Sequence, residues 1–518
     1  MGADGCLFAC FCLMFIRKKK NPNGFFTIQV IDKSQSKYRV AKNFGVAKSL
    51  LQQSELVVQA AQWIKEKSAS IELDLFSEDK QIENFLNGIR SLRREGLELV
   101  LGKIFDDIGF NKISDPIFKQ LVLYRLAYPA SKLKTTQYLY RYHQIDWDED
   151  RVYRYLDKLH KSQKELVQQI SYSHTVKILQ GDPQIVFYDV TTVYFEIERE
   201  DELRTTGFSK EGKHQNPQIV LGLLVSKNGY PLAYDIYEGN KFEGHTLLPV
   251  IESFKAKYNL QKLIVVADAG LLSNKNIELL INKNYEFILG ARIKNESRIL
   301  QKKILETKFS NGQTKMFPKQ DNLKLIISYS DNRARKDAMN RERGLKRLEK
   351  QLGKGRFNKA SINNKGYNKY LKLTGDLTIS IDYDKYRADA CWDGLKGYIT
   401  NCALGTDEII ENYNHLWQIE KAFRISKTDL KIRPIYHRLP KRIEAHICLN
   451  FVAYKVYKEL ERQLKLLNSP LSVNKVIEIA QSIFQIEIET PKAKTIFRKT
   501  LLLTQEQKLL ASILNIET

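Results

Sequence analysis

Two aspartates that lie far apart in the chain stand where a sheet would place metal ligands. Asp189 falls inside the run IVFYDVTTVYFE, which is apolar on both sides of it, and a buried carboxylate costs several kcal/mol unless it is paired or bound to a metal. Asp268 ends the run LIVVAD, where a side chain projects from the edge of a sheet into a crevice. Adjacent parallel strands would bring the two acids together, and carboxylate pairs suit the hard cation Mg²⁺. For either aspartate alone a structural acid is the simpler interpretation, but their joint placement on the first and fourth predicted strands favours a metal site.

A third acid, Glu420, lies in the segment YNHLWQIEKAFRISKTDL, for which we predict a long amphipathic helix from Thr406 to Leu430. At about 100° per residue, its polar side chains fall on an arc of roughly 80°, beside an apolar stripe that would anchor the helix. A face with a phenol, an indole, a carboxylate and two cations suits a metal site that grips a phosphate backbone. A solvated face with an ion pair between Glu420 and Arg424 is the alternative. The arc contains Tyr413, Trp417, Glu420, Arg424 and Lys427, and the stripe contains Leu416, Ile419, Phe423 and Leu430.

The hydrophobic pattern changes abruptly from a helical period to a strand period at residue 185, and the strands and helices that follow must position these acids. We predict strands at 185–196 and 218–226, then a hairpin turn at Asn228-Gly229 and a returning strand PLAYDIYEG. Two helix-and-strand units follow, whose strands are LIVVAD and EFILGAR. The order βββαβαβ predicts an α/β fold, with a mixed sheet covered by helices.

The flanking regions differ in composition. Residues 115–180 have a fully helical pattern in which Tyr alternates with Arg and Lys; this suits DNA contact, although an ordinary bundle with solvated basic faces explains it as well. The predicted units are an N-terminal module with a small β-hairpin plus helices (1–112), a helical, DNA-binding candidate region (113–180), the first part of the catalytic core (181–294), a β-containing insertion (295–395), the end of the core with the Glu420 helix (396–455) and a C-terminal helical region (456–518).

The composition favours a polyanionic partner. The chain has 518 residues with 83 Lys and Arg against 60 Asp and Glu, a net charge of +23. Cations that neutralise phosphates release counterions, so nucleic acid is the leading candidate. A Lys-rich protein from an AT-rich genome without such a role is the alternative, and charge alone does not decide between them.

The start of the chain, its hydropathy and its cysteines indicate a cytoplasmic protein without a membrane segment, and a DNA partner would make it nucleoid-associated. No run reaches the roughly 18 apolar residues that span a bilayer. The start MGADGCLFACFCLMFIRKKK has its basic residues after the apolar stretch, contrary to a secretory signal, and we interpret residues 1–13 as a misassigned start before Met14. The six cysteines, at positions 6, 10, 12, 391, 402 and 448, form neither CxxC pairs nor a disulfide framework, which indicates a reducing interior.

The segments YDVTTVYFE, VVADAGLLSN and Y-x2-L-x3-E-x6-K resemble the three catalytic blocks of DDE transposases of bacterial insertion sequences, in the subgroup whose third block is written Y-R-E-K. The texts GFSKEGKHQNPQIVLGLLV, GNKFEGHT, GLKGYITN and IRPIYHRLPKRIEAHICLNF are similar to the same family, so the likeness covers roughly 185–455. The resemblance implies an RNase H-like core, a β-rich insertion, and DNA strand cleavage and transfer at terminal inverted repeats. It also implies Mg²⁺, or Mn²⁺ in its place, held by Asp189, Asp268 and Glu420, and phosphate contacts from Tyr413 and Lys427.

The chain departs from the family at Leu416, which occupies the position of the family's Arg and belongs to the apolar stripe. Arg424, one turn beyond Glu420, is our geometric substitute for it. Trp417 and Trp392 are candidates for stacking on a displaced base, although core packing is the stronger interpretation for each. We expect a homodimer on paired DNA ends.

Two alternative functions are a nuclease of the same fold that cuts without joining, and an inactive DNA-binding remnant of a mobile element. The presence of all three acids argues against the remnant. A Ser-His-Asp or zinc hydrolase finds no support, because the sequence has neither GxSxG nor HExxH.

Overall fold

The computed structural model describes the chain except for residues 1–13, 36, 68–77, 198, 210–211, 272, 321, 356, 359–360, 364–365, 375–377, 491–493 and 517–518. The interpretation of Met14 as the start concerns residues 1–13, which lie outside the described residues. The chain divides into two compact units, Met1–Arg90 with Ile488–Phe497, and Ser91–Glu487 with Arg498–Thr518. Each is described by itself.

The smaller unit contains an antiparallel sheet of order β1-β2-β3. Its core joins Ile28 and Val30 of the sheet to Ala60 of the helix α1, with Trp63 packed against them. The small β-hairpin predicted in the N-terminal module is confirmed as β2 and β3, whereas β1 was not predicted. The elements are β1 (Met14–Lys20), β2 (Phe26–Gln35), β3 (Lys37–Ala47), α1 (Leu50–Lys67) and α2 (Glu78–Asn87).

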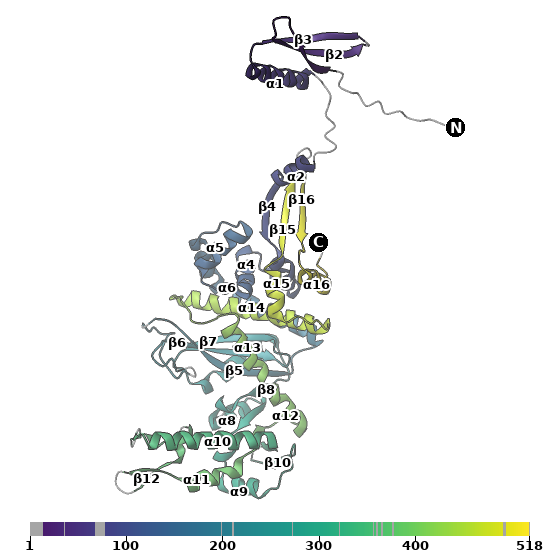
Figure 1. Ribbon diagram of the computed structural model, residues 1–518. Helices are drawn as coiled ribbons and strands as arrows, with labels where there is room; N and C mark the ends of the chain where they lie inside the picture. Colours follow the sequence, from purple (N-terminus) through teal and green to yellow (C-terminus); the bar gives the residue numbers. More distant parts are fainter. Residues whose placement is uncertain are drawn as a thin grey trace, which may run out of the picture. The chain divides into compact units, whose positions relative to one another are not determined.

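The larger unit is built on a mixed sheet whose strands, among the described residues, follow the order β10-β11-β14-β9-β8-β5-β6-β7 (Figure 1). The strands β5, β6 and β7 form an antiparallel meander, and β8 and β9 then run parallel to β5. This confirms the predicted mixed α/β sheet, in which three meandering strands are followed by two crossover units. The strands are β5 (Ile185–Tyr194), β6 (Gln218–Ser226), β7 (Pro231–Glu238), β8 (Ile264–Ala267), β9 (Glu286–Ala291), β10 (Thr314–Pro318), β11 (Lys324–Tyr329) and β14 (Leu395–Thr400).

The hairpin between β6 and β7 turns where the sequence predicts it. Gly229 has a φ of 80°, a conformation that a residue with a side chain rarely adopts. The Asn228-Gly229 pair therefore fixes the return of β7.

Helices cover both faces of this sheet, and alternate residues of each strand point to opposite faces. Val186 and Tyr188 of β5 pack with α7 and α8, whereas Phe187 and Val193 pack with α13 and α14. The covering helices are α7 (Leu247–Tyr258) and α8 (Asn274–Asn282) on one side, and α12 (Thr406–Asn414), α13 (Trp417–Thr428) and α14 (Pro440–Leu466) on the other.

The predicted helical region is confirmed. The long helix α14 lies between the sheet and the helices α4 and α6 (Figure 1). Asp115, Ser131 and Asp148 each cap the next helix by accepting a hydrogen bond from a backbone N–H of its first turn. The helices are α3 (Lys103–Ile108), α4 (Pro116–Ala127), α5 (Lys132–His143) and α6 (Glu149–Leu179).

Residues 295–395 have two roles in the structure. β10 and β11 extend the large sheet beyond β14, while Leu348, Tyr370, Leu371 and Ile381 form a separate small core. The region also contains the long basic helix α10 and the hairpin of β12 and β13, and this hairpin agrees with the predicted β content of the insertion. The remaining elements are α9 (Arg298–Glu306), α10 (Asp331–Leu352), β12 (Leu371–Thr374), β13 (Thr378–Ile381) and α11 (Tyr383–Ala388).

The C-terminal region is helical, as predicted, but it also contains two strands that the sequence analysis missed. In the larger unit, the Ser91 hydroxyl of β4 donates a hydrogen bond to the Glu487 carboxylate of β15 at 3.0 Å. Among the described residues, no helix is long and apolar enough to cross a membrane. The elements here are β4 (Ile89–Arg94), α15 (Val473–Ala480), β15 (Phe484–Glu489), β16 (Ile496–Leu501) and α16 (Gln505–Leu514).

Candidate active site

Strand register brings Asp189 and Asp268 to neighbouring positions. The parallel pairing of β5 with β8 ends at Tyr188 opposite Ala267, so the next residue of each strand is one of the two aspartates. Neighbouring strands lie about 4.8 Å apart, and residues opposite each other in register share a face. That face is the one covered by α13 and α14, because Phe187 and Val266, two residues before each aspartate, pack there.

The two carboxylates differ in their surroundings. Asp189 is half-buried in the middle of β5, and its Oδ1 accepts a hydrogen bond from the backbone N–H of Val190 at 2.8 Å. Asp268 is exposed just past the end of β8, and its Oδ1 accepts from the N–H of Ala269 at 2.6 Å and from the Tyr413 hydroxyl at 3.4 Å. Donors to a carboxylate fix its orientation, which is how outer groups prepare the ligands of a metal ion.

Glu420 lies in the first turn of α13, a helix that packs against β5 and β6. Its side chain is exposed, whereas Ile419 and Phe423 next to it are buried in the core. The apolar stripe therefore anchors the helix on the sheet face that carries Asp189 and Asp268, as the sequence predicted, and leaves Glu420 on its open side.

Two further side chains connect Glu420 with Asp268. Burial raises the pKa of the Tyr413 hydroxyl, and the negative charge of Asp268 and the weaker influence of Glu420 raise it further. Burial lowers the pKa of Lys396, as does nearby Arg333, while the charges of Asp268 and Glu420 act in the opposite direction. The Lys396 ammonium lies 4.5 Å from the centre of the Tyr413 ring. Asp268 and Glu420 therefore both influence the pKa values of the same two side chains, Tyr413 and Lys396.

The Tyr413 hydroxyl reaches Asp268 by passing over β9 at Gly290. A Cβ atom on Gly290 would lie 2.4 Å from the Tyr413 hydroxyl oxygen, so a larger residue there would push the ring away. The absence of a side chain at this position thus has a direct structural purpose.

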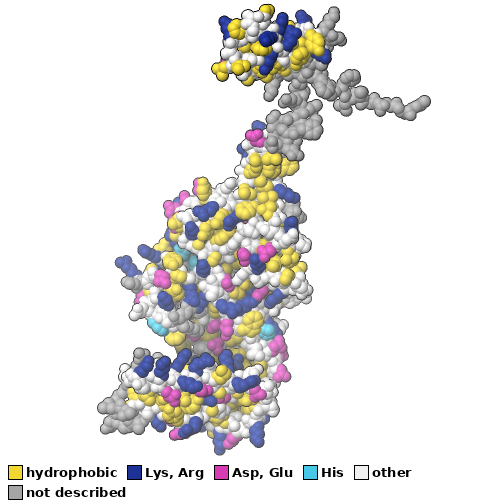
Figure 2. Space-filling view, viewed as in Figure 1, with side chains coloured by type: hydrophobic (Ala, Val, Ile, Leu, Met, Phe, Trp, Pro, Cys, Tyr) yellow, Lys and Arg dark blue, Asp and Glu magenta, His cyan; other side chains and the backbone are white. Residues whose placement is uncertain are grey.

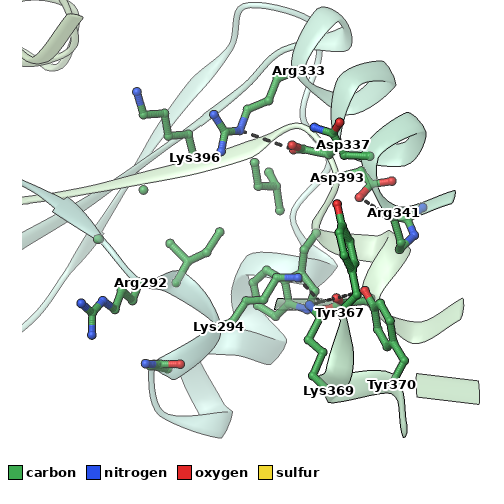
Figure 3. Close-up of a pocket in the computed structure, with 18 residues that line it drawn as sticks. Arg292, Lys294, Arg333, Asp337, Arg341, Tyr367, Lys369, Tyr370, Asp393 and Lys396 are labelled. Atoms are coloured by element: carbon green, nitrogen blue, oxygen red, sulfur yellow. Dashed lines mark hydrogen bonds and ion pairs between the residues drawn. The ribbon is translucent and has the colours of Figure 1, made fainter. Parts of the chain in front are cut away.

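A cavity of about 490 Å³ adjoins this environment, and Lys396 lines it. Figure 3 shows Lys396 and Arg333 at one end of it and Lys294, Lys369 and Tyr370 at the other. Most of its cations have acidic partners: Lys294 and Lys369 both bind Asp389, Arg341 binds Asp393, and Arg333 lies 3.5 Å from Asp337. Figure 2 shows a row of Lys and Arg side chains along the part of the molecule that contains α10.

Comparison with known proteins identifies this arrangement. A sequence model of the family described as "Transposase DDE domain" matches residues 180–455, more than half of the chain. The chain belongs to the DDE transposase family. It is a metal-dependent enzyme that cleaves and joins DNA.

Two solved structures are similar to the transposase, both weakly. A piggyBac transposase synaptic complex with hairpin DNA is 8% identical, with a TM-score of 0.38 over 84% of this chain and 80% of that one. A Mos1 mariner paired end complex with Mn is 13% identical, with a TM-score of 0.14 over 45% of this chain and 67% of that one. These scores are too low to carry an argument about this chain. No curated protein matches it.

The donor set of the transposase fits a hard divalent cation in part. Two carboxylates at neighbouring register positions, with solvent on one side, are what Mg²⁺ takes from a protein when water and substrate phosphates complete its shell. Within the described residues, no three His, Cys, Asp or Glu side chains lie close enough together to hold a metal ion as they stand. Joint ligation by Asp189, Asp268 and Glu420 therefore stays a prediction.

The predicted helix from Thr406 to Leu430 is wrong in one respect, because it is broken between α12 and α13. The backbone N–H groups of Leu416, Gln418 and Ile419 bond to the carbonyl three residues earlier instead of four. The tighter turn changes the angular offset between Tyr413 and Glu420, so the predicted arc does not hold across the break. Tyr413 is buried and its hydroxyl meets Asp268, whereas Trp417, Glu420 and Arg424 are exposed and Lys427 is half-buried.

The structure distinguishes the two tryptophans of the transposase. Trp417 is 48% exposed on α13, so the core-packing interpretation does not describe it. Trp392 lines the larger cavity and packs against a small apolar core that includes Ile293 and Leu395, with the Lys294 ammonium 6.0 Å from its ring centre. Leu416 is buried in the main core, as predicted.

The sequence analysis missed Lys396 as a site residue. It stands in GLKGYITN, a segment quoted for its likeness to the family, but nothing in that text ties it to the acids. The signal was present in the strand alternation: Tyr398, two residues further on, packs in the same core as Ile288 and Tyr413. Only the pairing of β14 with β9 brings that face to Asp268.

Proposed function

We propose that this transposase is encoded by a bacterial insertion sequence and acts at the terminal inverted repeats of its own element, in the cytoplasm and in association with the nucleoid. The observation that carries the proposal is the register of β5 and β8, which places Asp189 beside Asp268 on the face covered by the Glu420 helix. This is the arrangement expected of carboxylates that share cations at a sheet edge.

In this proposal Asp189, Asp268 and Glu420 hold Mg²⁺, for which Mn²⁺ can substitute. When bound, the ions supply stabilisation of the charge that develops on the attacking and leaving oxygens. The chain's own groups prepare the site. The Tyr413 hydroxyl and the Ala269 N–H fix one oxygen of Asp268, and the Val190 N–H fixes one oxygen of Asp189. The exposed Glu420 side chain is proposed to turn towards the two aspartates and complete the set.

Positively charged surfaces position the DNA without reading its sequence. Lys427, Arg424 and Trp417 on α13 lie on the helix that carries Glu420 and are proposed to contact the transposon end. Trp392 is proposed to stack on a displaced base at the larger cavity. The buried Tyr413 is proposed to touch the DNA only through its hydroxyl. Both ends of an element must be handled together, so we propose a homodimer on paired ends.

The test is Mg²⁺-dependent cleavage of a DNA fragment that carries the flanking inverted repeat. Wild type is compared with Glu420→Gln and Asp268→Asn, which remove a charge without changing the shape of the side chain. The matched control is Glu411→Gln, an exposed acid of α12 that pairs with Lys227 away from the two aspartates. We expect both site variants to lose cleavage and the control to keep it. Equal cleavage by wild type and Glu420→Gln would remove Glu420 from the site.

A second assay separates the transposase from a nuclease that cuts without joining. A precut end is supplied with target DNA, so that no first cleavage is needed. We expect joined products with wild type and none with Glu420→Gln. Cleavage of intact ends by a wild type that never joins precut ends would contradict the proposed function.

A further inference from the structure

A second cavity, of about 260 Å³, lies away from the three acids, where α4, α5, α6 and α14 meet the loop after α13. The side chains on which the argument depends are Arg125 of α4, Lys132 and its capping neighbour Ser131 at the start of α5, and His437 and His446. None of the residues that line it, among those described, is an Asp or a Glu.

Two cations are buried in this cavity without a counterion. Arg125 is 6% exposed and Lys132 is 4% exposed. Neither side chain has a hydrogen-bond or ion-pair partner within the part of the chain that the structure describes. Buried charges in proteins are normally paired, because an isolated one is costly to remove from water. Two such cations on the wall of one cavity need an explanation.

The surroundings add to the positive potential. The cavity opens at the N-terminus of α5, a helix of 12 residues, where free backbone N–H groups and the helix dipole favour an anion. Burial, followed by the charges of Lys132 and Arg125, lowers the pKa of His437 to about 3. Burial lowers the pKa of Lys132 too, and the charge of Arg125 lowers it further. Burial is the main cause of both shifts, and the positive charges of the neighbouring side chains add to it, since no acidic side chain is among the described residues that line the cavity.

We propose that this cavity binds a phosphate group. The two buried cations match the charge of a terminal phosphate, and the Ser131 hydroxyl and the first N–H groups of α5 supply neutral donors. Tyr436, which is 71% exposed, lies at the cavity and can stack on the remainder of a nucleotide. Inorganic phosphate, a free nucleotide and the 5′ end of a DNA strand share this chemistry. The inference is independent of the three acids.

Calorimetric titration of the full-length protein with inorganic phosphate, against sodium chloride of matched ionic strength, is the first test. We expect heat from binding at one site in wild type and in Glu420→Gln alike. Lys132→Met should lose at least tenfold in affinity, whereas Lys134→Met, an exposed lysine of the same helix, should bind as wild type does. Phosphate binding that Lys132→Met does not weaken, or no heat beyond that of chloride, would overturn the proposal.

Thermal unfolding gives a readout that a merely structural role would not move. Lys132→Met removes an unpaired buried charge, so it should melt higher than wild type without phosphate and should lose the rise in Tm that phosphate gives to wild type. If this variant fails to fold, Arg125→Met is measured in the same way. A lower Tm for both variants without phosphate would contradict the inference.

Oligonucleotides that carry either a 5′ phosphate or a 5′ hydroxyl identify the source of the phosphate. A preference for the phosphorylated strand that Lys132→Met abolishes assigns the cavity to DNA ends. Equal binding of the two strands, together with binding of inorganic phosphate, supports a small phosphate compound instead.

Discussion

Two cavities of the larger unit are rich in Lys and Arg, but most cations of one are paired with acids, whereas two buried cations of the other have no acid partner among the residues that the structure describes. In the cavity next to the acids, Lys294 and Lys369 share Asp389, and Arg341 binds Asp393. In the cavity at the start of α5, Arg125 and Lys132 have no acidic partner within the described residues, and both are nearly inaccessible. Most cations of the first cavity are paired with acids, whereas the two buried ones of the second can bind the proposed phosphate group.

The difference shows what each region is suited to do. Paired, partly exposed cations cost little, and they can exchange their acidic partners for DNA phosphates as a strand passes. Unpaired buried cations reduce the free energy of unfolding until an anion arrives, so binding there is coupled to stability. Lys396 is intermediate between these cases. It is half-buried, and the charges of Asp268 and Glu420 offset only part of the effect of burial on its pKa.

The largest expected effect comes from Lys396, a cation on which the charges of Asp268 and Glu420 both act. Lys396→Met should lower the DNA cleavage rate by roughly 100- to 1000-fold, because a positioned charge next to the reacting phosphate is removed. Single-turnover cleavage at saturating DNA measures it, and Lys396→Arg should retain more of the rate. A Lys396→Met rate equal to that of wild type would mean that the cavity near the acids does not serve the chemistry.

A cation placed in the apolar core should lower the free energy of unfolding, and no ligand would be able to offset this loss. Leu416→Arg restores the residue of the family's motif at a buried position, so we expect it to lower the free energy of unfolding by about 2–4 kcal/mol. Urea unfolding measures the change, with Leu416→Met as the control of similar volume. A stable, fully active Leu416→Arg variant would show that this position can turn towards the DNA.

One titratable residue at each cavity should contribute to the free energy of unfolding, and the two contributions should be lost in different pH ranges. His437, whose pKa falls from its ordinary value near 6.5 to about 3, binds a proton when unfolded but not when folded. Its contribution is therefore present above pH 6.5 and is lost as the pH falls towards 3, at a cost of about 1.4 kcal/mol per pH unit. Burial raises the pKa of Asp389, but hydrogen bonds from Lys294, Lys369 and Tyr370 outweigh it and lower the pKa, so its contribution is lost only below about pH 4.

Urea unfolding of wild type and His437→Gln between pH 7 and 4.5 separates these ranges. The variant should lose less stability over this interval than wild type, whereas Asp389→Asn should follow the wild-type slope from a lower starting value. Parallel slopes for wild type and His437→Gln would show that burial and the neighbouring cations do not keep the histidine neutral in the folded protein.

The smallest expected effect concerns an exposed cation at the rim of the paired cavity. Arg292→Gln should weaken DNA binding slightly and reduce the slope of log K against log salt by about 1, since one phosphate contact is lost. Fluorescence anisotropy over a salt series measures it. An unchanged slope would remove Arg292 from the DNA path.

The sequence predicted the centre of the fold well and its edges poorly. The strands β5 and β6 can be predicted because they are long apolar runs. Asp189 and Asp268 are conspicuous because an acid is unexpected in or next to such a run. The break at Leu416 could not be predicted, because it depends on a local change in backbone hydrogen bonding that the apolar period does not record. The strand β15 has alternating apolar residues, FQIEIE, yet its partner β4 lies almost 400 residues earlier, and pairing at that distance leaves no local signal.

The cavity at the start of α5 was beyond prediction for a different reason. Lys and Arg are rarely buried, so a basic helical segment is interpreted as solvated by default. Only the packing of α4 and α6 against α14 shows that Arg125 and Lys132 face inward.

The central claim is that Asp189, Asp268 and Glu420 share cations, and the most direct measurement maps the metal itself. Fe²⁺ replaces Mg²⁺ in the full-length protein bound to transposon-end DNA, ascorbate and peroxide generate hydroxyl radicals at the ion, and mass spectrometry locates the backbone cuts. The account predicts cuts near all three acids, competed away by Mg²⁺ and lost together in Asp268→Asn. Cuts near Asp189 and Asp268 with none near Glu420 would contradict it.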